Sequence, residues 1–314
     1  GAPEQYWVGD HGRVSIYEET GGIWRKVHSI RGKERGKLGQ IVSMNASGNR
    51  IALKGEDHIW VYEKGDTGWR RIGQEIDNST PWGTPIILSF AGSISLSPDG
   101  NRLAIGSHLA DGNPAAPTRS GQVDVWEFSG DSWVRMGAPI VGEATGDYSG
   151  ASVSLSQDGS RVAIGAPENR GDGAIGADKG HVRVYRWSGQ AWTKLGNDID
   201  GTNNFDDNGL SVSLSASGNR VAVGGSGRIR LGPYGQVRIY ELQGGSWRQL
   251  GNDLRPDVAG SGWGGAPLDN ESVSLSADGQ RVAIAAPKTT FPGGDGFGER
   301  YEAGEVRIFD WKGG

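Results

Sequence analysis

Five carboxylates stand in short polar segments whose composition suits the binding of a cation or of sugar hydroxyl groups. The segments read GDYSG (146–150), NFDDNG (204–209) and PLDNE (267–271), and each precedes a strand of a repeated pattern. Loops at one position of a radial repeat lie together on one face, which predicts an acidic ring. Its members would be Asp147, Asp206, Asp207, Asp269 and Glu271. The alternative interpretation is that these side chains cap their own turns.

Other groups that commonly serve as catalysts or metal ligands show no diagnostic spacing. The five histidines form no H-x-H or H-x-x-x-H pair, although His11 and His181 stand at or beside equivalent strands of different repeats and could share a site. No G-x-S-x-G sequence marks a nucleophilic serine, and the lack of Cys excludes thiolate catalysis and cysteine-ligated zinc. Paired glycosidase carboxylates would come from different repeats, so spacing cannot reveal them. We expect no metal or cofactor, and binding rather than catalysis.

Three N-x-S/T sequons lie at Asn45, Asn78 and Asn270, in turns or loops between strands where a glycan could project. In a secreted eukaryotic protein these sites predict glycosylation. In a bacterial protein they carry no such meaning.

Composition excludes several classes of partner. The 32 basic and 37 acidic residues are interspersed and give a net charge of -5, so there is no basic footprint for nucleic acid or for an anionic membrane surface. No apolar run approaches the roughly 18–20 residues that span a bilayer, so we expect no membrane insertion. The 55 glycines and 12 tryptophans indicate many turns and many aromatic anchors.

An internal repeat must position the candidate residues. Five segments align, IVSMNASGNRIALKG (41–55), SISLSPDGNRLAIGS (93–107), SVSLSQDGSRVAIGA (152–166), SVSLSASGNRVAVGG (211–225) and SVSLSADGQRVAIAA (272–286). In each, an alternating run is followed by Ser-Gly or Asp-Gly and a second alternating run, which predicts a β-hairpin. The glycine of the pair should take the positive φ of a tight turn. These glycines are Gly48, Gly100, Gly159, Gly218 and Gly279.

Two further strands follow each hairpin. The third is predicted at 58–63, 121–128, 180–187, 235–242 and 304–311, and the fourth at 68–73, 132–137, 191–196 and 246–251. The amino terminus enters the pattern partway, at 5–9, 12–19 and 22–27. One tryptophan position recurs in the fourth strand, and we expect it to pack between units rather than to stack on a sugar or cofactor. It comprises Trp24, Trp69, Trp133, Trp192 and Trp247.

Four-stranded units repeated radially predict an all-β fold, a β-propeller of antiparallel blades in one domain over residues 1–314. The repeat units run approximately over 1–37, 38–88, 89–147, 148–206, 207–267 and 268–314. Six third strands but only five first and five fourth strands are found. We therefore expect six blades with one incomplete, and five or seven blades are the alternatives.

The phrase RVAIGAP (161–167), followed by a loop and GHVRVYRW (180–187), resembles the FG-GAP repeat of the integrin α-chain propeller. The FG half is degenerate, as in Ser149-Gly150 and Asn208-Gly209. The repeated sequence segments also resemble tandem repeats of secreted proteins from marine microbes and algae. The calcium loop that such propellers can carry is replaced by a short SxDG turn with at most one carboxylate, so calcium sites are not implied.

The resemblance and the lack of catalytic motifs favour a non-catalytic extracellular or cell-surface module, a surface or matrix component that contacts proteins or glycans. An incomplete last blade would expose the edge of the strand at 304–311, which a neighbouring copy could complete. The alternative is a polysaccharide-binding lectin or carbohydrate-active enzyme that uses the axial loops with aromatics such as Trp82, Phe205 and Trp263.

Overall fold

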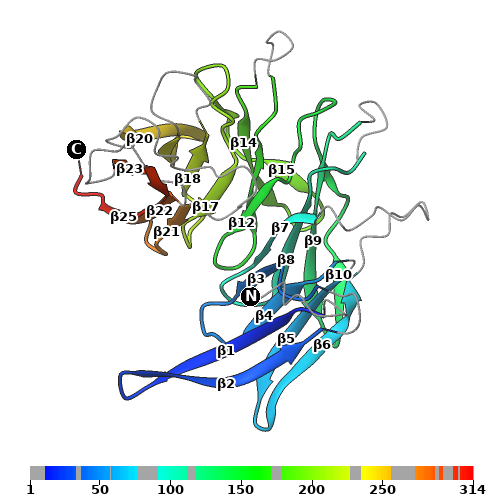
Figure 1. The fold of residues 1–314 in the computed structure, drawn as a ribbon. Helices are drawn as coiled ribbons and strands as arrows, with labels where there is room; N and C mark the ends of the chain where they lie inside the picture. Colours follow the sequence, from blue (N-terminus) through cyan, green and yellow to red (C-terminus); the bar gives the residue numbers. More distant parts are fainter. Residues whose placement is uncertain are drawn as a thin grey trace.

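The computed structural model describes residues 11–32, 37–56, 58–76, 91–111, 118–170, 178–226, 235–255, 273–286, 290–292, 300–302 and 305–313. Every regular element in these ranges is a β-strand, and paired strands within the sheets are antiparallel. Figure 1 shows the sheets following one another in chain order around a common centre. None of these residues forms a helix long and apolar enough to cross a bilayer.

The described strands form an amino-terminal hairpin, five sheets that we number I to V, and a small side hairpin. The amino-terminal hairpin contains β1 (Arg13–Thr20) and β2 (Ile23–Arg31). Sheet I contains β3 (Ile41–Met44), β4 (Arg50–Lys54), β5 (Ile59–Gly65) and β6 (Gly68–Ile76). Sheet II contains β7 (Ala91–Leu96), β8 (Arg102–Ser107), β9 (Gln122–Ser129), β10 (Ser132–Arg135) and β11 (Ile140–Val141).

Sheet III contains β12 (Ser152–Leu155), β13 (Arg161–Ala166), β14 (His181–Trp187), β15 (Trp192–Lys194) and β16 (Ile199–Asp200). Sheet IV contains β17 (Ser211–Leu214), β18 (Arg220–Gly225), β19 (Gln236–Gln243) and β20 (Ser246–Leu254). Sheet V contains β21 (Val273–Leu275), β22 (Arg281–Ala286) and β25 (Glu305–Asp310), and the side hairpin pairs β23 (Thr290–Pro292) with β24 (Arg300–Glu302).

The first two strands of each sheet form the hairpin that the repeat predicts. In sheet III, Leu155 pairs with Val162, and Gly159 between the strands has a φ of 63°. Asp158 accepts hydrogen bonds from the hydroxyl of Ser156 at 3.0 Å and from the N–H of Ser160 at 2.9 Å. The carboxylate of this turn is therefore used within the turn. The predicted positive φ is confirmed at all five glycines, Gly48, Gly100, Gly159, Gly218 and Gly279.

Each apolar core lies between two successive sheets. The core between sheets III and IV combines Ala163, Val182 and Val184 of sheet III with Val212, Leu214, Val221 and Val223 of sheet IV. Similar clusters join the amino-terminal hairpin to sheet I, and sheets I to II, II to III and IV to V. Successive residues of a strand point to opposite faces. The first two strands of a sheet thus present Val, Leu and Ile to the preceding sheet and Ala and Ser to the following one.

The innermost strands are joined by hydrogen bonds from backbone to serine. The hydroxyl of Ser154 in β12 accepts the N–H of Leu214 in β17 at 2.9 Å. The same bond joins Ser43 to Leu96, Ser95 to Leu155, and Ser213 to Leu275, at 2.9 to 3.1 Å. The small polar residues of the repeated SVSLS pattern therefore act between sheets.

The recurring tryptophan also acts between sheets, as the sequence predicts. Nε1 of Trp192 donates to the carbonyl of Met136 at 3.0 Å, and Nε1 of Trp247 donates to that of Leu195 at 2.8 Å, each in the preceding unit. The residue after Leu195 is glycine, and this leaves room for the indole ring of Trp247. A Cβ at Gly196 would lie 2.8 Å from Cδ1 of that ring. Interblade packing is thus confirmed for these two positions.

We expect Ser154→Ala to lower the free energy of unfolding by about 1–2 kcal/mol, because the N–H of Leu214 loses its acceptor. The matched control is Ser274→Ala. Ser274 is the equivalent residue of sheet V and is exposed, so its loss should change stability by less than about 0.5 kcal/mol. Urea denaturation measures both values. Equal losses would contradict the role assigned to the hydroxyl.

Candidate functional site

Asp147 and Asp206 occupy the same place in the loops that enter sheets III and IV, and both side chains are buried. Oδ2 of Asp147 accepts the N–H of Glu143 at 3.1 Å and that of Ala144 at 2.8 Å. Asp206 accepts the equivalent two N–H groups, three and four residues before it, at 3.0 and 2.9 Å. Burial raises the pKa of the Asp147 carboxyl. These bonds are those expected of turn-capping carboxylates.

Asp207 is buried and accepts a hydrogen bond from the hydroxyl of Ser226. Its φ of 47° lies in the left-handed region that non-glycine residues seldom adopt. Lys37 and Tyr148, which stand at the equivalent loop positions, also have positive φ, at 39° and 55°. The unusual backbone is therefore a property of the repeated loop rather than a mark of one special site.

The remaining members of the predicted ring, Asp269 and Glu271, lie outside the described residues, as do Trp82 and Trp263. Phe205 is 41% exposed beside the Asp206 loop. The acidic ring therefore stays a prediction, and its three described carboxylates are all engaged by their own loops or by neighbouring sheets.

Among the three sequons, only Asn45 lies in the described part of the chain, while Asn78 and Asn270 lie outside it. The side chain of Asn45 is almost buried. Its Nδ2 donates to Oγ of Ser47 at 3.0 Å and to Oδ1 of Asn49 at 2.7 Å, so a glycan attached there would replace turn hydrogen bonds. Glycosylation at the three positions remains a prediction.

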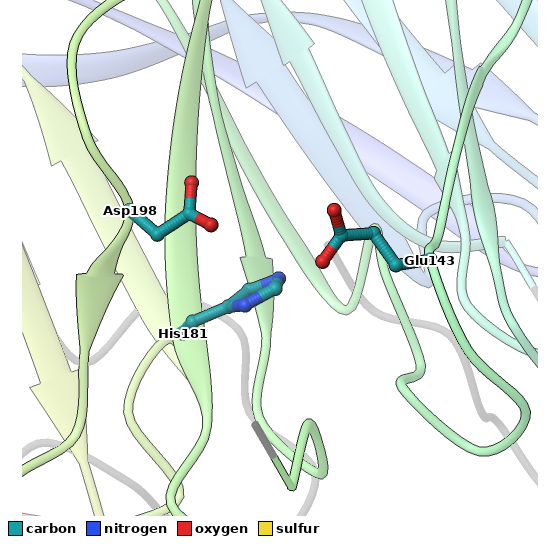
Figure 2. Close-up of side chains that lie close together, drawn as sticks. All are labelled: Glu143, His181 and Asp198. Carbon is teal, nitrogen blue, oxygen red and sulfur yellow. The ribbon is translucent and has the colours of Figure 1, made fainter. Parts of the chain in front are cut away.

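The described residues bring together a cluster of Glu143, His181 and Asp198, which Figure 2 shows converging from three segments. His181 opens β14 and Asp198 precedes β16, both in sheet III, whereas Glu143 follows β11 of sheet II. One ligand atom from each lies within 4.8 Å of the others. His181 is 5% exposed. The cluster thus has donors that could hold a divalent cation.

The guanidinium of Arg183 already pairs with both carboxylates of this cluster. Nη2 of Arg183 contacts Oε2 of Glu143 and donates to Oδ2 of Asp198 at 2.9 Å. The other oxygen of Asp198 accepts a hydrogen bond from Nζ of Lys194 at 2.8 Å. Burial opposes the charge of Arg183, but these carboxylates raise its pKa. A cation entering here would meet two fixed positive charges, so the cluster does not fit a metal site.

Sheet IV contains a related network without a histidine. Nη1 of Arg238 lies 3.3 Å from Oδ2 of Asp206, and its Nε lies 3.0 Å from Oδ1 of Asp253. The side chain of Arg238 is nearly inaccessible to solvent. Gln236 stands at the position of His181. Each network has one arginine, which pairs with a carboxylate of its own sheet and with a carboxylate in the loop that connects the preceding sheet to it. We therefore interpret the cluster in Figure 2 as one version of a repeated link between sheets.

Sequence reasoning noticed His181 but missed Glu143 and Asp198. A signal was present, because the units with Arg183 and Arg238 in the third strand continue after the fourth strand as Gly-Asn-Asp. The unit that has Asp124 in the third strand continues as Gly-Ala-Pro at 137–139. An arginine in the third strand is thus accompanied by an aspartate after the fourth strand, and the unit with Asp124 in the third strand lacks that aspartate. His11, the suggested partner of His181, belongs to the amino-terminal hairpin segment and is not part of the cluster.

Burial, followed by the charge of Arg183, lowers the pKa of His181 from 6.5 to about 4. The imidazole is therefore neutral near neutral pH. In the unfolded chain it gains a proton below about pH 6.5, whereas in the folded chain it does so only near pH 4. The unfolded state binds more protons in this window, so stability falls as the pH drops from about 6.5 to about 4.

We expect His181→Gln to remove this part of the pH dependence, because glutamine fills the equivalent position in sheet IV. Relative to the variant, the wild type should lose on the order of 2–3 kcal/mol between pH 7 and pH 4. Urea denaturation at a series of pH values measures the difference. His28→Gln, at a partly exposed position of β2, serves as the control. Parallel stability curves for wild type and His181→Gln would contradict the buried neutral histidine.

No protein-family model and no curated protein matches the sequence of the chain. The similarity to solved structures, in contrast, extends over nearly the whole chain. A functionally unknown protein from Desulfotomaculum acetoxidans has 15% identity and a TM-score of 0.55, with 95% of this chain and 76% of that one covered. The periplasmic gluconolactonase of Pseudomonas aeruginosa has 16% identity and a TM-score of 0.55, with coverage of 95% and 80%.

A candidate 6-phosphogluconolactonase from Bacteroides fragilis has 13% identity and a TM-score of 0.54, with 96% of this chain and 83% of that one covered. At such identities the likeness concerns the fold alone. Together with the antiparallel sheets it shows that this chain has an all-β, propeller-like fold.

Proposed function

We propose that this chain is a non-catalytic binding module that associates end to end with further copies of itself. In this proposal the amino-terminal hairpin and sheets I to V represent six blades, of which one is incomplete. The observation that carries it is a pair of uncovered apolar faces, one at each end of the series of sheets. Every described interface between these ends is filled by an apolar cluster.

The first uncovered face belongs to sheet V. Val306 and Ile308 of β25 are 68% and 65% exposed. The equivalent residues of sheet III, Val182 and Val184, are fully buried against sheet IV. The side chains of β25 are thus of the type that the next sheet covers elsewhere in the chain.

The second uncovered face belongs to the amino-terminal hairpin. Trp24 of β2 is 70% exposed, whereas Trp247 at the equivalent position is 5% exposed because it packs on the preceding sheet. Tyr17 of β1 is 52% exposed. This end therefore presents the face that normally contacts a preceding sheet. In an internal interface such as that between sheets III and IV, third-strand valines of one sheet pack on the tryptophan-bearing face of the next sheet. The two uncovered end faces are of these two types, which favours a head-to-tail contact between copies.

The proposal includes the relation to FG-GAP repeats, one domain over residues 1–314, and an extracellular or cell-surface location. Parallel bridges join Gly121 to Ser149 and Gly180 to Asn208. They link the glycine that opens the third strand to the degenerate FG dipeptide of the next unit. These bridges give the FG position and the glycine before the third strand a structural role, which supports the relation.

The alternative is a lectin or carbohydrate-active enzyme that uses the axial loops. The described carboxylates of those loops are held by hydrogen bonds within the fold, which favours the binding module. Because a gluconolactonase has a similar fold, lactone hydrolysis is the activity to assay. Turnover of gluconolactone, or polysaccharide binding that is lost in Asp207→Ala, would contradict the non-catalytic protein-binding proposal.

We expect the double variant Val306→Glu, Ile308→Glu to abolish association, and Trp24→Glu to do the same from the other end. Both replace exposed residues, so folding should be preserved. Val134→Glu, at a 53% exposed valine of β10, is the control. Sedimentation velocity at several concentrations measures assembly. The decisive step is to mix the two defective variants, because each retains one intact end and the mixture should form dimers but nothing larger. A wild type that stays monomeric at all concentrations would overturn the proposal.

A further inference from the structure

An arginine begins the second strand of each of the five sheets, next to the hairpin turn that joins the first two strands. In four sheets its cross-strand partner in the third strand is a carboxylate, to which Nε of the arginine donates at 2.6 to 3.0 Å. The four pairs are Arg50 with Glu63, Arg102 with Glu127, Arg220 with Glu241, and Arg281 with Asp310. These four sheets thus neutralise the arginine within their own strands.

Sheet III departs from this rule. Its arginine is Arg161, and the residue that pairs with it across the strands is Arg186. The next residue across, Thr193 of β15, is neutral. Side chains at directly opposed positions lie on one face of the sheet, where like charges repel each other. Burial, followed by the charge of Arg186, lowers the pKa of the Arg161 guanidinium, although the charge of Asp158 opposes this. Two positive charges therefore stand where the other sheets have a pair of opposite charges.

The guanidinium of Arg161 is held in place by the following sheet. Its Nη1 donates to the carbonyl of Gly218 at 3.1 Å and to Oδ1 of Asn219, both in the hairpin turn of sheet IV. The side chain lies against Gly218, where an added Cβ would be 2.7 Å from Cδ of Arg161. Arg161 is partly buried, whereas Arg186 is exposed. Contacts with sheet IV thus fix the orientation of Arg161 without a carboxylate of sheet III.

Arg50 of sheet I shows what the second edge of such an arginine binds. Its Nη1 donates to the carbonyl of Gly100 at 3.1 Å and to Oδ1 of Asn101 at 2.9 Å, the counterparts of the two bonds of Arg161. Its Nε and Nη2 both contact Oε1 of Glu63, at 2.9 and 2.8 Å. Among the ion pairs of the described residues, none includes Arg161 or Arg186. The Nε edge of Arg161 is therefore oriented for an anion that sheet III does not supply.

We propose that Arg161 and Arg186 bind a phosphate monoester, whose oxygens take the place that the carboxylate of Glu63 occupies in sheet I. Nε and Nη2 of Arg161 would donate to the phosphate oxygens, and the guanidinium of Arg186 would contact them from the solvent side. Guanidinium groups bind phosphate through paired, charge-assisted hydrogen bonds. A phosphate monoester carries nearly two negative charges at neutral pH, so it balances both arginines, whereas a carboxylate would balance only one.

This site is independent of the proposed end-to-end association, because it lies between sheets III and IV and at neither uncovered end. The phosphate can be carried by a protein side chain or by a sugar. Both carriers present the same group to the two arginines, so the test compares them directly.

The test titrates the full chain with N-acetyl-phosphoserine, with glucose phosphorylated at its primary hydroxyl, and with acetate, all at constant ionic strength. The readout is the set of arginine Nε–H signals in proton–nitrogen correlation NMR spectra. We expect saturable shifts of the Arg161 and Arg186 signals with both phosphate esters, and about tenfold weaker binding of acetate. The ester that binds more tightly identifies the carrier. Absence of shifts at these two signals, or equal affinity for acetate, would overturn the proposal.

Arg186→Glu gives sheet III the carboxylate that the other sheets have. We expect it to weaken phosphate binding about tenfold or more, because the new carboxylate pairs with Arg161. Urea denaturation should show a stability at least equal to that of the wild type, so lost binding would not reflect lost folding. Arg31→Glu is the matched control, because Arg31 is exposed and also has an arginine, Arg13, as its cross-strand partner. Equal loss of binding in both variants would show that net charge alone attracts phosphate, and the assigned site would be wrong.

Glu241→Arg is the converse variant, since it places a second arginine beside Arg220 in sheet IV. Nη1 of Arg220 donates to the carbonyl of Gly279 at 3.1 Å, so this guanidinium is oriented as that of Arg161 is. We expect the Nε–H signal of Arg220 to shift with the phosphate esters in the variant and to stay unchanged in the wild type. An unchanged signal in a folded variant would show that an oriented arginine with a second arginine beside it is insufficient, and would count against the proposal.

Discussion

The fold depends on the interface between successive sheets, where the hydroxyl of a serine in one innermost strand accepts a backbone N–H of the next. The bond from Leu214 to Ser154 is one member of a series that runs through sheets I to V. The apolar clusters follow the same rule, since each unites two neighbouring sheets. A single sheet therefore has little core of its own. Its stability comes from the neighbouring sheets on either side. The two end faces are uncovered because each lacks one such neighbour among the described residues.

Close approach of the sheets explains the glycines and the unusual backbone of the loops. A Cβ at Gly165 would lie 2.0 Å from the carbonyl of Gly209 in the next unit, so only glycine admits that loop. The residue before the dipeptide Asn208-Gly209 takes a positive φ, and so do Lys37 and Tyr148, its counterparts in the other described loops. Strain of this kind often marks active sites. Here its recurrence assigns it to the architecture, because all units must make the same turn.

Charged networks are the part of the interface that varies between units. Arg183 joins Glu143 and Asp198 across sheets II and III, whereas Arg238 joins Asp206 and Asp253 across sheets III and IV. Removing one partner of a buried pair leaves an uncompensated charge, so such networks favour the correct neighbour over a shifted one. The charged pairs thus distinguish interfaces whose apolar residues are nearly interchangeable. His181 is a local addition to one of these networks, at the position that Gln236 occupies in sheet IV.

The sequence by itself determined the repeated strands, the hairpin turns and the packing role of Trp192 and Trp247, because alternation, Asp-Gly pairs and repeated positions are local and periodic signals. Only the tertiary structure decided which polar residues meet, since Glu143, His181 and Asp198 come from segments of two sheets. It also decided the fate of the predicted site carboxylates, because Asp147 and Asp206 look the same in sequence whether they face a ligand or cap a loop. Exposure is likewise a property of neighbours. Val306 and Val182 occupy the same place in the repeat, and only the presence of a following sheet makes Val182 buried while Val306 is exposed.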